Sequence, residues 1–281
     1  MNSKANADTK TIDGFGDEWS RFNQTTLSDE ELNSLFNAYF NIFPWANLPA
    51  EAVGFDLGCG SGRWGRCVAP RVARLHCIDP SPDALNVARK NLAGFSNCEF
   101  HLAAVDDIPL SAGTMDFGYA LGVLHHVPDT LAGIAACARL LKPGAPFLLY
   151  LYYAFDNQPI WYRCIWQLTD VARHVISRTP LWLRHAASQI IAAAIYYPLA
   201  RLSLLLERMG RNVGCMPLSV YRNKSFYTMR TDALDRFGTR LEHRFTIEQI
   251  RNMMQAADLE NIQFSESPPY WCAVGYKKKM T

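Results

Sequence analysis

The residues whose types and spacing are best suited to chemistry lie at 56–65, where the sequence is D-L-G-C-G-S-G-R-W-G. A short apolar run that ends in Asp56 leads into a turn with glycines at 58, 60 and 62. Glycine adopts backbone conformations closed to other residues, and it lets a ligand approach the main chain closely. The stretch therefore predicts a ligand-binding loop between a buried strand and a helix.

Two kinds of ligand compete for this loop. Gly60, Gly62 and Gly65 match G-x-G-x-x-G, the pattern that lays the diphosphate of a nicotinamide dinucleotide on a helix N-terminus. The carboxylate of Asp56 would face and repel that diphosphate, whereas it would attract the ammonium and sulfonium groups of S-adenosylmethionine. The charge of Asp56 thus favours a cationic ligand.

The segment from Asp56 to Gly65 resembles the first motif of class I S-adenosylmethionine-dependent methyltransferases. In that family, an acid precedes a G-x-G-x-G turn that binds the cofactor. The cofactor-binding residues that this resemblance and the later motifs imply are Asp56, Gly58, Cys59, Gly60, Gly62, Arg63, Asp79, Pro80, Ala104, Val105, Asp106, Leu121 and Trp19.

Asp79 ends a second apolar run, about 20 residues after the first glycine, where an acid can accept hydrogen bonds from both ribose hydroxyls. Its alternative role is the N-cap of a helix that begins near Pro82. The family often places a further acid at the position of Ala104 to bind the adenine amino group. Adenine recognition is therefore expected from backbone groups near Val105 and from Asp106, which is otherwise a solvated turn residue.

The segment 122–129 reads G-V-L-H-H-V-P-D and resembles the family's fourth motif, at the mouth of the active site. His125 and His126 are the catalytic candidates, because a neutral imidazole can accept a proton from an acceptor hydroxyl or amine. Alternatively, both histidines only orient the loop and contact the cofactor, since transfer to a good nucleophile needs positioning alone. Metal-binding relatives carry glutamates here, so no metal is expected.

The elements that must position these residues alternate between strands and helices. This order predicts an α/β fold with a Rossmann-like, mostly parallel, seven-stranded sheet and helices on both faces. Five strands are expected before residue 154, and a last helix and a strand hairpin complete the core over residues 231–281.

The N-terminal residues 1–14 are polar and are expected to form a flexible tail without a signal peptide. The following F-G-x-x-W-x-x-F, at 15–22, resembles the opening of some small-molecule methyltransferases, in which this segment covers the cofactor. The alternative is that Trp19 and Phe22 only pack on the edge of the sheet. The eight cysteines are scattered and show no zinc-site spacing, which indicates a reduced, cytoplasmic protein.

A helical insertion is expected at 154–230, after the fifth strand, with helices at 161–177, 181–197 and 199–209 broken at Pro180 and Pro198. Residues 186–200 carry no charge, but fifteen residues fall short of the ~20 that a membrane span needs. We therefore expect no span. The insertion is interpreted first as a lid over the acceptor, and otherwise as a dimer surface or as an interfacial helix in peripheral membrane contact.

The charge distribution bears on the acceptor. Residues 151–230 hold ten Lys or Arg and three Asp or Glu, which favours a small-molecule or lipid-like acceptor that bears carboxylate or phosphate. The total charge of +2 and the lack of a basic, aromatic module speak against nucleic acid. The substrate-contact candidates, each of which could instead be a structural hydrogen bonder, are Tyr153, Tyr227, Asp235 and His243.

Together these features predict a methyltransferase of small-molecule biosynthesis that uses S-adenosylmethionine and acts as a monomer or homodimer. Two alternatives are a non-catalytic S-adenosylmethionine-binding partner and an NAD(P)-dependent oxidoreductase. The acceptor atom stays open.

Overall fold

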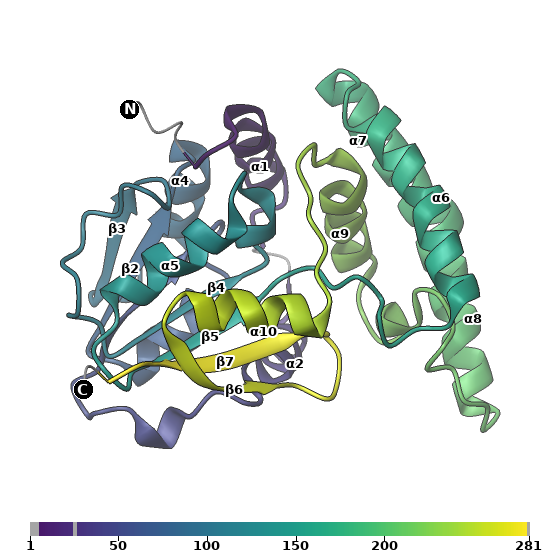
Figure 1. The fold of residues 1–281 in the computed structure, drawn as a ribbon. Helices are drawn as coiled ribbons and strands as arrows, with labels where there is room; N and C mark the ends of the chain where they lie inside the picture. The colour runs from purple at the N-terminus through teal and green to yellow at the C-terminus, as the bar shows by residue number, and fades with distance from the viewer. Residues whose placement is uncertain (1–5, 25–26, 280–281) are drawn as a thin grey trace. The chain divides into compact units, whose positions relative to one another are not determined.

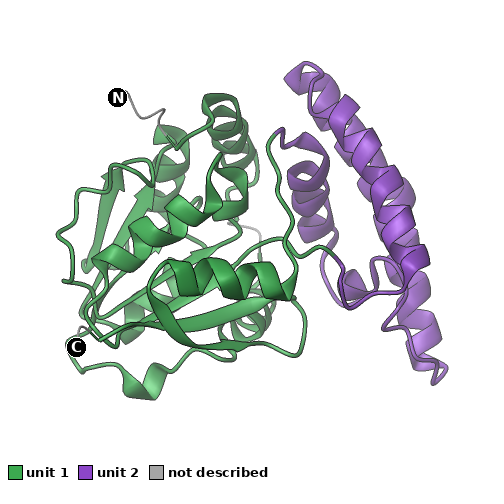
Figure 2. Ribbon diagram, viewed as in Figure 1, with its two compact units in different colours: residues 1–154, 241–281 green, residues 155–240 purple. Residues whose placement is uncertain are grey.

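The computed structural model describes residues 6–24 and 27–279 and divides the chain into two compact units (Figures 1 and 2). The first unit comprises residues 1–154 and 241–281, and the second comprises residues 155–240. The second unit is therefore an insertion into the first.

A seven-stranded sheet forms the centre of the first unit, with the order β3-β2-β1-β4-β5-β7-β6. The first five strands are parallel and β7 is antiparallel to both of its neighbours, so the predicted mostly parallel sheet is confirmed. From β1 the sheet grows first to one side, through β2 and β3, and then to the other side, through β4 and β5. The carboxyl ends of β1 and β4 therefore flank the switch point, where ligands bind in open α/β sheets. The strands are β1 Val53–Leu57, β2 Arg74–Asp79, β3 Cys98–Leu102, β4 Phe117–Leu121, β5 Pro146–Tyr150, β6 Leu259–Phe264 and β7 Cys272–Lys277.

Helices cover both faces of this sheet, as Figure 1 shows. Apolar residues point alternately to the two faces, so that Phe117 and Tyr119 join one core cluster and Ala120 joins the other. The central strands are apolar on both sides because both sides are covered. The helices of this unit are α1 Thr9–Arg21, α2 Asp29–Phe40, α3 Gly65–Val68, α4 Pro82–Asn91, α5 Thr130–Leu140 and α10 Ile247–Ala256.

Helix α1 begins at Thr9, so the expectation of a flexible tail up to residue 14 is wrong from that residue on. Asp8 caps the helix by accepting a hydrogen bond from the Thr11 amide. Gly16 packs so closely on α4 that a Cβ there would lie 2.6 Å from Ser81 Oγ. Tertiary packing thus stabilises a segment whose composition alone suggests no helix. Residues 1–5 of the expected tail lie outside the described residues.

The second unit contains α6 Ile160–Ile176, α7 Leu181–Ile191, α8 Tyr197–Arg208 and α9 Phe226–Gly238. Helix α9 packs through Met229 and Ala233 against Ala192, Tyr196 and Ala200 of the α7–α8 segment. The expected boundary at residue 230 is wrong because it falls inside this continuous helix. Residues 231–240 accordingly belong to the insertion rather than to the core.

Pro198 does not break the helix, contrary to expectation. A five-residue π-helical segment, Ala192–Tyr196, joins α7 to α8, and Pro198 stands in the first turn of α8. The wider π turn accommodates Pro198, because proline lacks an amide hydrogen and its ring crowds the preceding turn. The resulting helix, Leu181–Arg208, has 28 residues and is long and apolar enough to cross a membrane by length and composition. The expectation of no span is drawn from the fifteen uncharged residues 186–200, whereas the helix that contains them is nearly twice as long. Length and composition alone do not place a helix in a membrane, so that expectation stays a prediction.

Candidate active site

The glycine loop that follows β1 has the backbone geometry its sequence predicts. Gly58, Gly60 and Gly62 have φ values of 70°, 53° and 75°, in the left-handed region that favours glycine. The amides of Gly58 and Cys59 donate to the Ile78 carbonyl at 2.7 and 3.0 Å, which anchors the loop to β2. The Cys59 side chain is buried in the core, so only its backbone faces the loop's ligand side.

Asp56 is 1% exposed and lies beside Tyr119 of β4. Burial raises the pKa of its carboxyl to about 8, and the Tyr119 hydroxyl offsets part of this shift. Its Oδ2 atom makes no hydrogen bond among the residues that the structure describes. Asp56 is therefore largely protonated at neutral pH without a ligand, and a bound cation would favour its ionised form. The negative charge predicted for Asp56 therefore forms when a cationic ligand binds and is largely absent before.

Asp79 connects the end of β2 to the glycine loop. Its Oδ2 accepts from the Gly60 amide and its Oδ1 from the Ser81 amide, each at 2.9 Å. Burial raises the pKa of Asp79 to about 6, and these two backbone hydrogen bonds oppose the shift. The N-cap of α4 is Ser81, which accepts from the Ala84 amide, so the capping alternative for Asp79 is wrong. Its contact with the ribose stays a prediction.

Helix α1 lies against the glycine loop and the histidine motif. A Cβ at Gly60 would lie 2.9 Å from Trp19 Nε1, and the Phe15 ring centroid is 4.9 Å from that of His126. Phe22 is buried in the core. The contact of Trp19 with Gly60 is the arrangement expected of a segment that covers the cofactor.

The remaining cofactor candidates fall into different environments. Val105 and Leu121 are buried, whereas Ala104 is half-buried and Asp106 is exposed. The Asp106 carboxylate accepts from the Asn6 amide at 2.8 Å, so its contact in the structure is to the N-terminal segment. The role of these four residues at the adenine stays a prediction.

Pro80 and Arg63 flank the same loop. Pro80 is half-buried and directly follows Asp79. The Arg63 guanidinium lies 4.3 Å from the ring centroid of Trp64, and its buried Nε atom has no hydrogen-bond partner within the described ranges. The cation–π contact thus holds the Arg63 guanidinium against Trp64, and its Nε donor is a candidate for a ligand contact.

His125 and His126 lie in a 3₁₀ turn, Leu124–His126, directly after β4. The His125 ring is fully buried and stacks on Tyr152 with 3.9 Å between ring centroids. Burial lowers the pKa of His125 well below its usual value, with further lowering by His126, Arg244 and His243. His125 is therefore neutral, and such a weakly basic imidazole is poorly suited to accept a proton.

His126 is oriented differently. Its Nδ1 lies 2.7 Å from the Leu241 carbonyl oxygen. A carbonyl can only accept, so in the neutral ring Nδ1 carries the hydrogen and Nε2 carries the lone pair. Of the two histidines, His126 is the one held in the tautomer of a general base.

The structure brings His243 to this motif and adds residues that the sequence did not indicate. The His243 amide donates to the His125 carbonyl at 2.9 Å. The neighbouring Arg244 pairs with Glu242 at 2.8 Å and lies 5.0 Å from the Tyr152 ring centroid. The sequence analysis missed Tyr152, Leu241, Glu242 and Arg244, although all five residues before Ala154 are Tyr or Leu and charges alternate around His243.

The other substrate candidates lie in different units. Tyr153 follows β5 in the first unit, with its ring centroid 5.7 Å from that of Tyr270. Tyr227 and Asp235 lie on α9 of the second unit, where the Tyr227 carbonyl accepts from Thr231 and the Asp235 carboxylate accepts from Thr239, the C-cap of the helix. Substrate contact by these residues stays a prediction.

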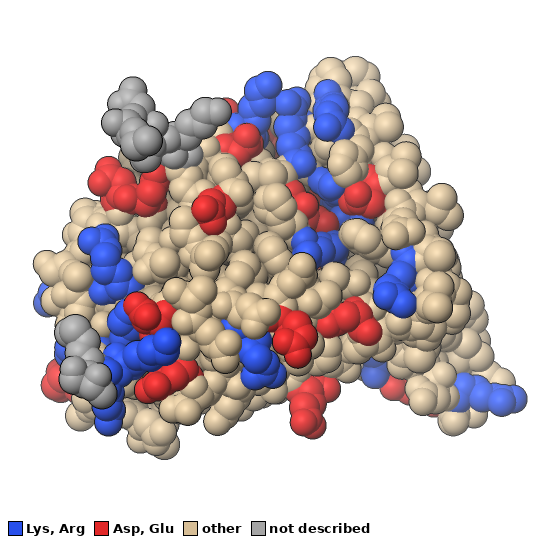
Figure 3. Space-filling model, in the orientation of Figure 1, with Lys and Arg blue, Asp and Glu red and all other residues tan. Residues whose placement is uncertain are grey.

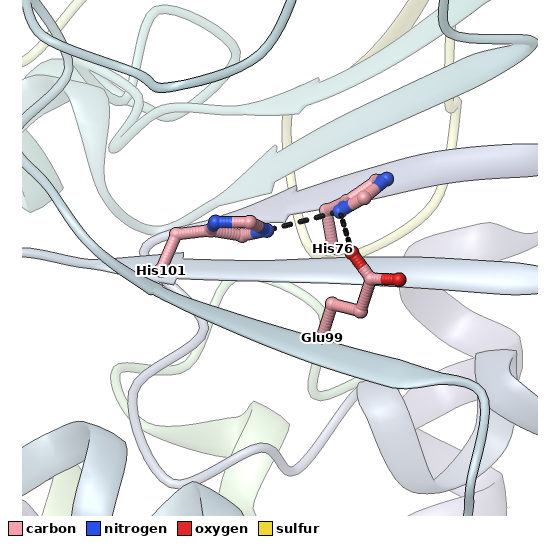
Figure 4. Close-up of side chains that lie close together, drawn as sticks. All are labelled: His76, Glu99 and His101. Atoms are coloured by element: carbon pink, nitrogen blue, oxygen red, sulfur yellow. Dashed lines mark hydrogen bonds and ion pairs between the residues drawn. The ribbon is translucent and has the colours of Figure 1, made fainter.

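A cluster of His and Glu lies on β2 and β3 (Figure 4). His76 Nδ1 is 3.0 Å from His101 Nε2 and 3.3 Å from Glu99 Oε2. Within residues 6–24 and 27–279, this is the group of three side chains close enough to share a metal ion. Glu99 also pairs with Arg74 at 3.2 Å, and His76 lies three residues before Asp79 in mid-strand. The cluster is therefore separate from the loop and motif above.

The residues at the ends of β1 and β4 fit S-adenosylmethionine. Asp56 Oδ2 and Arg63 Nε are buried polar atoms that lack partners in the described part of the chain, and buried polar groups are normally satisfied. A Cβ at Gly122 would meet nothing within 4 Å, which leaves room beside the end of β4. The glycine loop would hold the amino-acid part of the cofactor, and Asp79 would hold its ribose.

Comparisons with known proteins agree with this geometry. A model of the methyltransferase domain family matches residues 55–144. Among solved structures, a chain in complex with the Haloferax volcanii Trm112 methyltransferase activator has a TM-score of 0.52 and 15% identity, covering 94% of this chain and 98% of that chain. An S-adenosylmethionine-dependent methyltransferase from Methanosarcina mazei has a TM-score of 0.50 and 15% identity, covering 83% and 95%. At these identities, the two structures support the fold alone.

Curated relatives give the family. With the fold and the glycine loop, they show that the chain belongs to the class I S-adenosylmethionine-dependent methyltransferases of small-molecule type, and its cofactor is S-adenosylmethionine. It is similar to the ubiquinone biosynthesis O-methyltransferase of Xanthomonas axonopodis pv. citri (strain 306), with 37% identity over 187 residues that cover 66% of this chain and 74% of that protein. The protein of the same name from Xanthomonas oryzae pv. oryzae (strain PXO99A) is 36% identical over 186 residues, covering 65% and 73%. The chain is therefore an enzyme, which decides against the oxidoreductase and the non-catalytic partner.

Proposed function

We propose that this enzyme methylates a hydroxyl group on an apolar, lipid-like small molecule in a biosynthetic route. The observation that carries the proposal is the tautomer of His126, which the Leu241 carbonyl holds with the hydrogen on Nδ1 and the lone pair on Nε2. A hydroxyl is a weak nucleophile until it loses its proton, so a base of this kind suits an oxygen acceptor. The O-methyltransferases named above as relatives support the same acceptor atom.

The chain's own residues have separate tasks in this proposal. S-adenosylmethionine supplies a methyl carbon that is activated by the positive sulfur and leaves S-adenosylhomocysteine. His126 Nε2 takes the proton that the acceptor hydroxyl loses as its oxygen forms the new bond to carbon. The stacked rings of His125 and Tyr152 form a neutral aromatic wall beside it, which keeps water away from the hydroxyl. Asp56, ionised by the bound cation, stabilises the donor end.

The second unit gives little support to an acidic group on the acceptor, although its charge suggested one. Its arginines bind mainly within the unit: Arg173 bonds to the Thr239 carbonyl, Arg184 to the Ser177 carbonyl and Arg222 to Glu207. They stabilise the unit itself. We therefore propose an acceptor defined by its hydroxyl and its apolar body.

The experiment is to incubate the full chain with S-adenosylmethionine labelled in the methyl group and with matched phenols that bear either a long polyprenyl chain or none. Mass spectrometry of the product should show a methyl ether, formed faster on the polyprenylated phenol. A labelled amine, thiol or carbon product from a cell extract, with neither phenol labelled, would overturn the proposed acceptor. Equal rates on both phenols would overturn its lipid-like character.

A further inference from the structure

Helix α6 of the second unit has its apolar face outside and its charged face inside. Trp161, Leu168 and Val175 are 49%, 73% and 65% exposed, whereas Arg173 is 4% exposed and pairs with Asp170 at 2.7 Å. At 100° per residue, the exposed apolar residues fall within one sector of roughly 140°, which is an apolar stripe. The stripe consists of Ile160, Trp161, Ile165, Leu168, Val171 and Val175.

The α7–α8 helix shows the same inversion. Its buried positions recur about every fourth residue and are small or polar at most places, whereas large apolar residues such as Trp182 and Leu205, 71% and 55% exposed, point outward. Small residues at a buried helix contact are typical of helices whose surroundings are apolar. The buried positions are Arg184, Ser188, Ala192, Tyr196, Ala200 and Ser203.

These two exposed faces lie on helices that share a partner. Both α6 and α7 pack on α9, whose residues include Asp232, Asp235 and Arg236. The large exposed apolar residues of α6 and of the α7–α8 helix form two stripes, which together we call the outer face. In the view of Figure 3, uncharged residues cover most of the surface over α6 and α8, with basic residues near the ends of these helices. A face this apolar does not suit permanent contact with water.

We propose that the outer face docks on the surface of an anionic lipid bilayer. The exposed cations Arg178 and Arg211 precede and follow the α7–α8 helix, and the exposed rings of Trp161 and Trp182 are near the starts of α6 and α7. Apolar stripes bordered by arginine and tryptophan are typical of helices that lie in the bilayer interface. The two helices also bury charged residues, Arg173 and Arg184, within the unit, which favours docking in the plane over a span.

Charge favours lipid over a second copy of the chain. Residues 155–240 carry twelve Lys or Arg and five Asp or Glu, so two copies of this unit would repel each other, whereas anionic headgroups would attract it. Docking depends on this face alone and not on the proposed acceptor, so each can fail without the other. If both hold, the enzyme meets its lipid-like acceptor at the membrane surface.

The test is co-sedimentation of the full chain with vesicles of phosphatidylcholine alone and of phosphatidylcholine mixed equally with phosphatidylglycerol. The wild-type chain should bind the anionic vesicles, and salt should weaken the binding. Leu168→Glu should weaken binding by about tenfold or more, because it places a charge in the stripe. Leu102→Glu is the matched control, since Leu102 is 61% exposed on β3 of the first unit, and it should bind like the wild type.

Two further measurements complete the test. Calorimetry with S-adenosylhomocysteine should give the same affinity for both variants, which shows that they fold. Absence of wild-type binding to anionic vesicles, or equal losses in the two variants, would overturn the proposal. So would a dimer in analytical ultracentrifugation that Leu168→Glu dissociates, because the outer face would then belong to a second copy.

Discussion

Asp56→Asn offers the sharpest test of the site, because it keeps the shape of the side chain and removes its titration. Burial raises the pKa of Asp56 from 3.8 to about 8 in the ligand-free fold. In the unfolded chain, the carboxyl returns to its ordinary pKa. Between these two values, the folded chain holds one proton more than the unfolded chain, so the free energy of unfolding falls as pH rises. Below pH 4 the difference vanishes, since both states are protonated.

The magnitude follows from the width of this interval. About four pH units at 1.36 kcal/mol each give an upper limit of about 6 kcal/mol. Relaxation around a buried charge lowers the realised effect, and we expect about 3 kcal/mol. Asparagine resembles the protonated acid, so Asp56→Asn should match the wild type at pH 4 and exceed its free energy of unfolding by this amount at pH 8.

The assay is urea unfolding of the ligand-free chain at pH 4, 6 and 8, with Asp107→Asn as an exposed control that should behave like the wild type at every pH. Calorimetry at pH 7 in two buffers of different ionisation enthalpy should show that S-adenosylmethionine binding releases about one proton from the wild type and none from Asp56→Asn. A difference in unfolding free energy that is the same at all three pH values would refute the account of Asp56.

Four other substitutions test the loop and the motif. Gly58→Ala should lower the free energy of unfolding by about 2–4 kcal/mol, because φ is 70° and the new Cβ would lie 2.4 Å from Val123. It should also abolish the binding of S-adenosylhomocysteine in calorimetry. Near-normal binding would contradict the loop assignment. Asp79→Ala should lower the affinity for S-adenosylhomocysteine about 10–100-fold at pH 8, whereas His243→Ala should change this affinity less than about threefold. Equal effects would mean that the cofactor and acceptor sides are misassigned. His126→Gln should lower kcat about 10²–10⁴-fold with unchanged S-adenosylhomocysteine affinity in calorimetry; a loss below about threefold would favour a positioning role.

The parts that the sequence predicted well are those governed by local rules. The glycines at 58, 60 and 62 indicated a left-handed turn, and the structure has positive φ at each. The alternation of strands and helices predicted the mostly parallel sheet, because a buried strand between two helix layers has the sequence of a short apolar run. The position of Asp79 at a strand end followed from the same pattern.

The parts that the sequence missed depend on contacts between distant segments. Leu241 is 115 residues from His126, and no local pattern shows that its carbonyl fixes the histidine tautomer. The ion pair of Glu242 and Arg244 similarly lies beside Tyr152, although the inserted residues 155–240 separate them in the sequence. Helix α1 likewise depends on its packing against Ser81.

The second unit shows why periodicity alone could not settle the role of the insertion. The apolar stripe that contains Leu168 and Val175 has the same helical periodicity as a helix face buried in a core. Periodicity predicts which residues share a face of a helix, but not what that face contacts. The structure decides this by burying Arg173 and Arg184 with hydrogen bonds to backbone carbonyls, which places the charges inside and the stripes outside. Substituting Arg173 by methionine would remove those bonds and leave the carbonyls of Thr239 and Arg240 without this donor. The inverted pattern is thus fixed by buried arginines, and the exposed stripes follow from them.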